Sequence, residues 1–102
     1  MSFDNIRTND IDQYIGKPNV LIIDLREPEE YANGHIPTAV NIPYDHLEER
    51  KYSLKNYDLL IFYCDRGNIS LLAARDMLKE GFYIKSLFGG LRAYRGRLEK
   101  SR

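Results

Sequence analysis

Two short, uninterrupted apolar runs constrain the fold of this chain more than any other feature. Residues 20–23 read Val-Leu-Ile-Ile, and residues 59–63 read Leu-Leu-Ile-Phe-Tyr. A strand with one face in water alternates apolar and polar residues, whereas a strand covered on both faces is apolar throughout. We therefore interpret both runs as interior strands of a sheet that has helices on both faces.

Weaker strand patterns and helix signals alternate with these two runs. Further strands are expected near residues 5–7, 39–42 and 83–88. Proline, glycine and the spacing of apolar residues predict helices over residues 8–14, 28–33, 43–50, 70–80 and 91–98. Strands that alternate with helices indicate a parallel sheet. We predict one α/β domain over residues 1–102, with a five-stranded parallel sheet between two layers of helices.

Several residues set the expected helix ends and buried faces. Pro28 fits the first position of its helix, and Gly34 is expected to end that helix in the left-handed conformation. Apolar residues at helical spacing predict the buried faces of two later helices. These faces are expected to consist of Leu71, Ala74 and Leu78 in one helix and of Leu91, Tyr94 and Leu98 in the other.

The composition excludes two classes of partner. The chain carries 15 Lys and Arg against 15 Asp and Glu, so its formal net charge is zero, and nucleic-acid binding, which needs a basic excess, is not expected. No apolar run approaches the roughly 20 residues of a membrane span, and residues 1–5 do not resemble a signal peptide. A single cysteine suits a reducing compartment. We therefore predict a cytoplasmic protein without membrane contact.

Cys64 is the only cysteine, and it directly follows the second apolar run. Sites in parallel α/β sheets form beyond the carboxyl ends of the strands. Six residues separate this thiol from the body of the next helix: Asp65, Arg66, Gly67, Asn68, Ile69 and Ser70. We expect the backbone N–H groups of this loop to face the sulfur and to favour the thiolate, which is the reactive form of cysteine. Gly67 allows the curl because glycine tolerates positive φ, and Ser70 either caps the helix or donates its hydroxyl to a bound anion.

The loop residues also have a purely structural interpretation. Cys64 is a small buried hydrophobic residue if the loop amides point away from it. Asp65 and Arg66, whose charges cancel, are then solvated side chains on the rim. No metal site is predicted, because Cys64, His35 and His46 do not have the spacing of metal ligands. His46 is expected on the surface of a short helix.

Asp24 and Arg26 follow the first apolar run and have two interpretations of their own. Asp24 lies at the carboxyl end of that strand, like Cys64, or it only caps the turn before the next helix. Arg26 lies beside the site, or it pairs on the surface with Glu29 or Glu30.

The motifs around these residues resemble the rhodanese homology domain family. Residues 24–31 match the pattern Asp-x-Arg-x-x-x-Glu-(Tyr/Phe), and residues 34–43 match Gly-His-Ile-x-x-Ala-x-Asn-(Ile/Leu)-Pro. The Cys64 loop resembles the active-site loop of that family. Gly89-Gly90 resembles its Gly-Gly pair before the last helix, where Tyr94 stands in place of the usual tryptophan. The resemblance spans about residues 5–99 and implies a rhodanese-like fold with strand order 3-2-4-5-1.

The resemblance implies a sulfurtransferase. In the family, the active cysteine takes a sulfane sulfur from a donor such as thiosulfate or a persulfide, holds it as a persulfide, and passes it to cyanide, a thiol or a protein acceptor. Cys64 is the matching nucleophile, and no metal or organic cofactor is implied. Asp24 and Arg26 match residues that lie near the active-site loop in relatives, and His35 matches a buried polar tie between segments.

The loop departs from the family in its charge. Relatives often carry an arginine just before the serine, where this chain has Ile69, and Asp65 follows the cysteine. We therefore expect weak thiosulfate binding and a preference for a thiol or protein persulfide donor. A basic C-terminal stretch is either a solvated face or a docking surface for an acidic carrier protein; its members are Arg92, Arg95, Arg97, Lys100 and Arg102.

Two alternative functions follow from the same residues. Cysteine phosphatases and arsenate reductases of related fold place an arginine after five intervening residues, where this chain has Ser70, so that chemistry ranks low. A non-catalytic rhodanese-like interaction or redox-sensing module is the other alternative, and the intact loop around Cys64 disfavours it.

Overall fold

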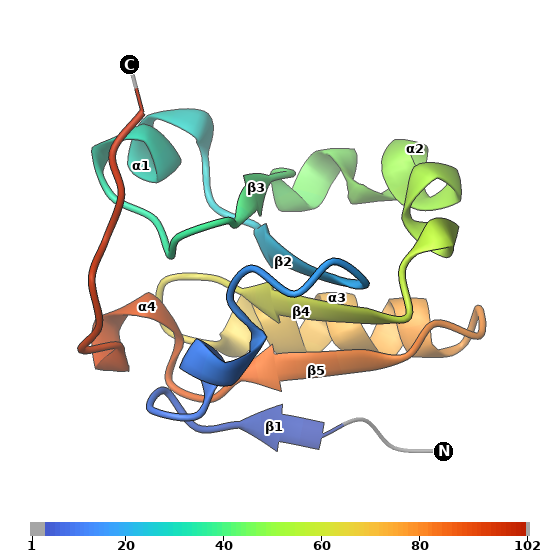
Figure 1. The fold of residues 1–102 in the computed structure, drawn as a ribbon. Helices are drawn as coiled ribbons and strands as arrows, with labels where there is room; N and C mark the ends of the chain where they lie inside the picture. The colour runs from blue at the N-terminus through green and yellow to red at the C-terminus, as the bar shows by residue number, and fades with distance from the viewer. Residues whose placement is uncertain (1–3, 102) are drawn as a thin grey trace.

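All five strands run parallel in one sheet, in the order β1-β5-β4-β2-β3. The computed structural model describes residues 4–101, and Figure 1 shows the chain as a ribbon. The strands are β1 (Asp4–Ile6), β2 (Val20–Asp24), β3 (Val40–Asn41), β4 (Leu59–Tyr63) and β5 (Ile84–Leu87). Read from β3, this is the predicted order 3-2-4-5-1, so the expected fold is confirmed.

Short helices connect the strands, and only one of them is longer than two turns. The α-helices are α1 (Pro28–Asn33), α2 (Leu47–Arg50), α3 (Asn68–Leu78) and α4 (Gly90–Ala93). The 3-10 helices are η1 (Ile11–Tyr14), η2 (Tyr44–His46) and η3 (Lys51–Asn56). The predicted helix over 43–50 is therefore a 3-10 turn followed by one α-helical turn, and the predicted helix over 8–14 is a single 3-10 turn. His46 lies exposed in η2, as expected.

The two interior strands send alternate side chains into two cores, one on each face of the sheet. In β4, Leu60 and Phe62 join the core under α2, η3 and α3, whereas Ile61 and Tyr63 join the core on the opposite face. The second core also contains Ile11 from η1 and Tyr94, which follows α4. Figure 1 shows α3 behind the sheet and α4 beyond the arrowheads of β4 and β5. The continuous apolar sequence of these strands is thus explained by burial on both faces.

Two expected helix features are wrong. Gly34 has φ 164°, which is extended backbone rather than a left-handed exit from α1. The long helix is buried through Ser70, Ala73, Ala74 and Met77, whereas Leu71 is 39% exposed. The face predicted from Leu71, Ala74 and Leu78 is therefore turned by about one residue, because small side chains let α3 approach the sheet closely.

The last predicted helix is also shorter than expected. Tyr94 has the extended ψ of 136° and ends α4, so Leu98 lies outside any helix and is 45% exposed. Beyond it the chain runs back along α1, where Glu99 and His35 exchange two backbone hydrogen bonds of 2.8 and 2.9 Å. The C-terminal segment is thus held by these two backbone bonds to His35 and not by the helix predicted over residues 91–98.

Candidate active site

The two residues predicted at strand ends lie on neighbouring strands. Asp24 is the last residue of β2 and is in register with Tyr63, the last residue of β4. Cys64 follows Tyr63 directly, so the thiol and the carboxylate come from the same edge of the sheet. This arrangement follows from parallel pairing, which brings the carboxyl ends of adjacent strands together.

One backbone amide of the loop points at the sulfur of Cys64. The Gly67 N–H donates to Sγ over 3.1 Å, and Gly67 has φ 102°, a left-handed conformation that favours glycine. The Ile69 amide, by contrast, donates to the side chain of Asn68 over 3.0 Å. Several amides of residues 65–70 were expected to face the sulfur, but in the described chain only the Gly67 amide hydrogen-bonds to it, and the Ile69 amide is engaged elsewhere.

A buried chain of hydroxyls lies beneath the sulfur. Ser70 Oγ is 3.8 Å from Cys64 Sγ and donates to the Gly67 carbonyl over 2.9 Å. Ser86 Oγ in β5 donates in turn to Ser70 Oγ over 2.9 Å. Ser70 therefore supports the turn that positions the Gly67 amide. Its hydroxyl proton is donated to the Gly67 carbonyl and not to the sulfur. Sequence reasoning missed Ser86, although a polar residue inside an apolar strand pattern was the available signal.

The Gly89-Gly90 pair holds the other side of the loop. The amides of Leu91 and Arg92, at the start of α4, donate to the carbonyls of Cys64 and Asp65 over 2.9 and 3.0 Å. A Cβ atom on Gly90 would lie 2.6 Å from those same two carbonyl oxygens. Glycine at this position therefore allows the contact between α4 and the loop, a role that the sequence pattern alone did not reveal.

Cys64 lines an open pocket of about 370 Å³ although the residue is only 4% exposed. The pocket lies between the loop, the start of α1 and η2, and its other lining residues are Leu25, Arg26, Glu27, Glu30, Tyr44, Asp45, Asp65, Arg66, Asn68 and Ile69. Asp65 and Arg66 are exposed at its rim, and their charged groups are 4.0 Å apart. Cys64 is thus a lining residue of an open pocket with room for a small sulfur compound.

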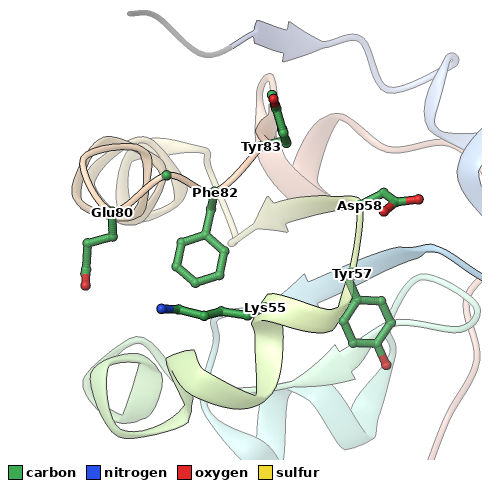
Figure 2. A pocket seen from close by; sticks show the side chains of 7 residues that line it. Lys55, Tyr57, Asp58, Glu80, Phe82 and Tyr83 are labelled. Carbon is green, nitrogen blue, oxygen red and sulfur yellow. The ribbon is translucent and has the colours of Figure 1, made fainter.

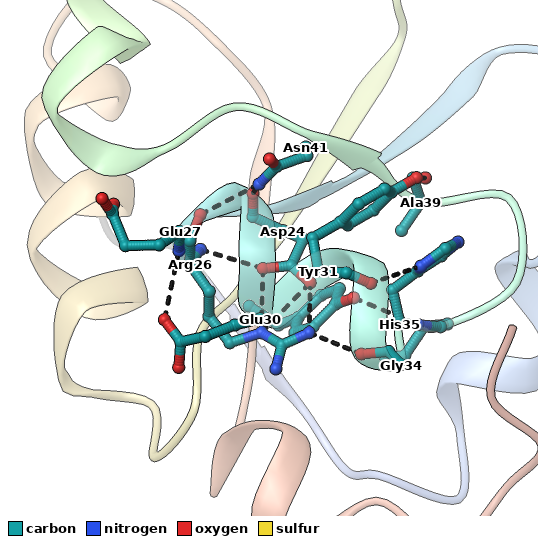
Figure 3. A network of polar contacts seen from close by, with 11 residues as sticks. Asp24, Arg26, Glu27, Glu30, Tyr31, Gly34, His35, Ala39 and Asn41 are labelled. Atoms are coloured by element: carbon teal, nitrogen blue, oxygen red, sulfur yellow. Dashed lines mark hydrogen bonds and ion pairs between the residues drawn. The ribbon is translucent and has the colours of Figure 1, made fainter. Parts of the chain in front are cut away.

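Asp24 and Arg26 form a buried ion pair next to this pocket (Figure 3). Both carboxylate oxygens of Asp24 accept from the guanidinium, at 2.8–3.2 Å, and Arg26 also donates to the Gly34 carbonyl over 2.6 Å. Burial disfavours the charge of Arg26, but its hydrogen bonds and attraction to Asp24 outweigh that cost and raise its pKa. The surface pairing of Arg26 with Glu29 or Glu30 is therefore wrong.

His35 connects α1 to the C-terminal segment, and Figure 3 shows it on the opposite side of the Asp24–Arg26 network from Glu27. Its Nδ1 is 2.8 Å from the Tyr31 carbonyl, and its ring stacks on Tyr31 with centroids 3.8 Å apart. The Tyr63 hydroxyl accepts the Ile36 amide over 3.1 Å. Burial, followed by the charge of Asp24 and a hydrogen bond to it, raises the pKa of Tyr63 strongly. These contacts fix the carboxyl ends of β2 and β4.

A second pocket, of about 520 Å³, lies at the other end of the strands. Figure 2 shows the side chains of Lys55, Phe82 and Tyr83 around it. Its residues come from the segments that lead into β4 and β5, and it contains neither a thiol nor a buried charge. Among residues 4–101, no three His, Cys, Asp or Glu side chains gather in a way that would hold a metal ion. No helix of the described chain is long and apolar enough to cross a membrane.

Comparison with known proteins gives concordant matches. A family model described as "Rhodanese-like domain" matches residues 8–97. The putative sulfur carrier protein YrkF of Bacillus subtilis is 39% identical over 79 residues, which are 76% of this chain and 43% of that protein. The thiosulfate:glutathione sulfurtransferase of Saccharomyces cerevisiae is 35% identical over 96 residues, covering 79% of this chain and 69% of the yeast protein.

Among solved structures, the rhodanese-like domain protein from Staphylococcus aureus has a TM-score of 0.85 and 27% identity. The match covers 98% of this chain and 100% of that one. The present chain spans less than half of YrkF, because the match covers 43% of that relative.

Proposed function

This chain belongs to the rhodanese-like domain family, and from that premise we propose that it transfers sulfane sulfur through a persulfide on Cys64. The observation that carries the proposal is the Gly67 amide 3.1 Å from Sγ of Cys64, a residue that lines an open pocket. An N–H donor at this distance stabilises a negative charge on sulfur. Relatives named as sulfurtransferases support the general class of reaction.

The first half-reaction loads the cysteine. The Cys64 thiolate attacks the outer sulfur of a donor, a new S–S bond forms, and the bond between that sulfur and the rest of the donor breaks with its electron pair. With thiosulfate the leaving group is sulfite, and with a persulfide it is a thiolate. A persulfide is more acidic than a thiol, so the terminal sulfur of the Cys64 persulfide is an anion, and we place it in the pocket that Cys64 lines.

The second half-reaction returns the thiolate. An acceptor thiolate attacks the terminal sulfur of the Cys64 persulfide, the S–S bond at Cys64 breaks, and Sγ takes the electron pair. The Gly67 amide stabilises Sγ as the leaving group. Two half-reactions through a covalent intermediate predict ping-pong kinetics. We place this reaction in a reducing compartment such as the cytoplasm, where a lone thiol persists, with a thiol or protein as the acceptor.

Intact mass spectrometry tests the proposal directly. Incubation with thiosulfate or a persulfide donor is expected to add one sulfur, about 32 Da, which cyanide or dithiothreitol removes. The Cys64→Ser variant, which keeps the size of the side chain, is the matched control and is expected to gain no mass. Absence of an adduct on the unmodified chain with both donors would favour a non-catalytic interaction module instead.

Phosphatase chemistry receives no support from the loop. The position that should hold a phosphate-binding arginine is Ser70, which is fully buried and bonded to Gly67 and Ser86. Arg66 is exposed at the rim instead. We therefore propose the transferase alone.

A further inference from the structure

Among the charged residues that line the Cys64 pocket, acidic side chains outnumber basic ones. Its charged residues are Glu27, Glu30, Asp45 and Asp65 against Arg26 and Arg66, so four carboxylates face two guanidinium groups. The chain as a whole has a formal net charge of zero. The negative charge is therefore a local property of this pocket, assembled from three segments that are far apart in the sequence.

One of the two guanidinium groups is already neutralised. Arg26 forms a bidentate pair with Asp24, whose side chain is completely buried. Arg66 is the other, and it lies 4.0 Å from Asp65. Within residues 4–101, Glu27, Glu30 and Asp45 form no ion pair within 4.0 Å, and Glu30 acts on Arg26 only from a longer distance.

Two of these carboxylates are held in place by the backbone. Glu27 and Glu30 form a capping box at the start of α1, in which each side chain accepts the backbone amide of the other residue. Figure 3 shows both of them on the side of the Asp24–Arg26 network away from His35. Because the capping box orders them, their charges face an incoming substrate without first having to be positioned.

A smaller, apolar groove lies next to the Cys64 pocket, on the other side of the Cys64 loop. This groove, of about 260 Å³, shares Arg66 and Asn68 with the pocket and is lined on its far side by Leu71 and Phe88. Phe88 is 67% exposed. A segment of protein chain that presents a cysteine to Cys64 can therefore place neighbouring residues on both sides of the loop, which a small thiol cannot do.

We propose that the sulfur donor or acceptor of Cys64 is a cysteine on a basic protein segment, and that the acidic pocket disfavours anionic sulfur compounds such as thiosulfate. The inference rests on the proposed transfer function and names its partner. In the delivering step the partner's thiolate attacks the terminal sulfur of the Cys64 persulfide. The S–S bond at Cys64 breaks, and the partner leaves as a persulfide while Sγ regains its charge. Positive side chains beside the partner's cysteine neutralise the carboxylates during this exchange of anions.

The electrostatic part is tested without any sulfur transfer. Methanethiosulfonates that carry an ammonium, a methyl or a sulfonate group react with a thiolate to give a mixed disulfide and methanesulfinate. Their rates with Cys64 are divided by their rates with free cysteine. We expect the normalised ammonium-to-sulfonate ratio to be about tenfold at low salt and to fall towards one at about 0.5 M salt, where charges are screened. A ratio at or below one at low salt would overturn the proposal.

Conservative variants identify the groups responsible. Glu30→Gln removes a charge but keeps the acceptor of the capping box, and Asp45→Asn removes an exposed charge in η2. Each is expected to lower the ratio about two- to fivefold, the range for one exposed charge pair. Glu29→Gln is the matched control, because Glu29 is an exposed neighbour in α1 that does not line the pocket. An equal effect of Glu29→Gln and Glu30→Gln would contradict the assignment to the pocket.

The partner class is tested by transfer from the persulfide form, after its added mass has been verified. Three acceptors are compared: a peptide with lysines on both sides of one cysteine, the same peptide with glutamates, and cysteamine as a small cationic thiol. The lysine peptide is expected to react at least tenfold faster than the other two. Equal rates for the lysine peptide and cysteamine would contradict the claim that the partner is a protein segment. A faster reaction of the glutamate peptide would overturn the whole inference. Failure to form the persulfide at all would instead reject the proposed function.

Discussion

Ser70 shows how a single residue keeps the thiol loop in place. Its hydroxyl is completely buried, donates to the Gly67 carbonyl and accepts from Ser86 Oγ. The amide of the same Gly67 is the donor to Cys64 Sγ. The position of the Gly67 N–H group on the sulfur therefore depends on the Ser70 hydroxyl, which is buried away from bulk water.

Ser70→Ala is expected to destabilise the fold and to slow transfer. The substitution leaves the Ser86 hydroxyl without its buried acceptor, which costs about 1–3 kcal/mol of the free energy of unfolding. Urea denaturation measures this loss, and the rate of mass gain with a sulfur donor measures the effect on the loop. Ser53→Ala is the control, because Ser53 is exposed in η3 and its loss is expected to change stability by less than about 0.5 kcal/mol. Equal stability of the two variants would contradict the role of the hydroxyl chain.

Among the elements, α4 is only four residues long, but it determines the shape of the active loop. Its first amides bond to the Cys64 and Asp65 carbonyls, and Gly90 makes that approach possible. Gly90 also has φ 65°, a conformation that residues with a side chain rarely adopt. A methyl group at this position therefore meets both a steric and a conformational obstacle.

Gly90→Ala is expected to displace the Cys64 loop and to reduce sulfur loading at least tenfold, since a Cβ at 2.6 Å from two backbone oxygens forces α4 away. The matched control is Gly81→Ala. Gly81 has φ 89° but no atom within 4 Å of the added Cβ, so this variant carries the conformational cost alone. It is expected to lose about 1 kcal/mol of stability and to keep full loading. Similar loading by both variants would show that the clash at Gly90 is relieved without movement of the loop.

The two interior strands could be predicted from the sequence because they are covered on both faces. Residues 20–23 and Leu59–Tyr63 are apolar on both faces, so their identity as strands did not depend on knowing which face was covered. For α3 the choice of face did depend on the neighbour: Ala73 and Ala74 are completely buried against the sheet, while the larger Leu71 and Leu72 are exposed. Side-chain size favoured the wrong face, because close packing here selects small residues.

Part of the candidate site was predictable because it lies at the carboxyl ends of the two interior strands. Cys64, its loop and Asp24 follow strand ends, and parallel pairing alone brings such residues together. A polar residue in an apolar strand pattern singles out Ser86 but does not name its partner. The bond from Ser86 to Ser70 and the contact between α4 and the loop depend on how separate segments pack. The acidic pocket likewise combines α1, η2 and the loop, so its charge is visible only after folding.

At the scale of the whole molecule, one buried polar network joins segments from most of the chain. Asp24 ends β2, Tyr63 ends β4, and the Ile36 amide that bonds to the Tyr63 hydroxyl lies between α1 and β3. The neighbouring His35 extends the network to Glu99. The polar network at the carboxyl ends of β2 and β4 therefore also contributes to the stability of the whole domain. Ionisation of its Tyr63 hydroxyl should change the free energy of unfolding of the domain.

The raised pKa of Tyr63 predicts how stability depends on pH at the alkaline end. In the folded chain, burial and the charge of Asp24 keep this hydroxyl protonated, whereas in the unfolded chain it ionises near its ordinary pKa of 10.0. Above about pH 10 the unfolded state binds fewer protons, so the free energy of unfolding falls as pH rises, by up to about 1.4 kcal/mol per pH unit. Below that pH the contribution of the protonated hydroxyl is fully present.

Tyr63→Phe isolates this contribution. At pH 7 the variant is expected to be less stable by about 1–3 kcal/mol, because the buried Ile36 amide loses its acceptor. Urea denaturation between about pH 7 and 11 should then show the two curves converging above pH 10, where only the unmodified chain loses the linkage term. Tyr83→Phe removes a hydroxyl from a residue that is 78% exposed, and its curve is expected to run parallel to that of the unmodified chain. A constant gap between the Tyr63→Phe and unmodified curves up to pH 11 would mean that the Tyr63 hydroxyl reaches water in the folded state, and that the network at the ends of β2 and β4 is open rather than sealed.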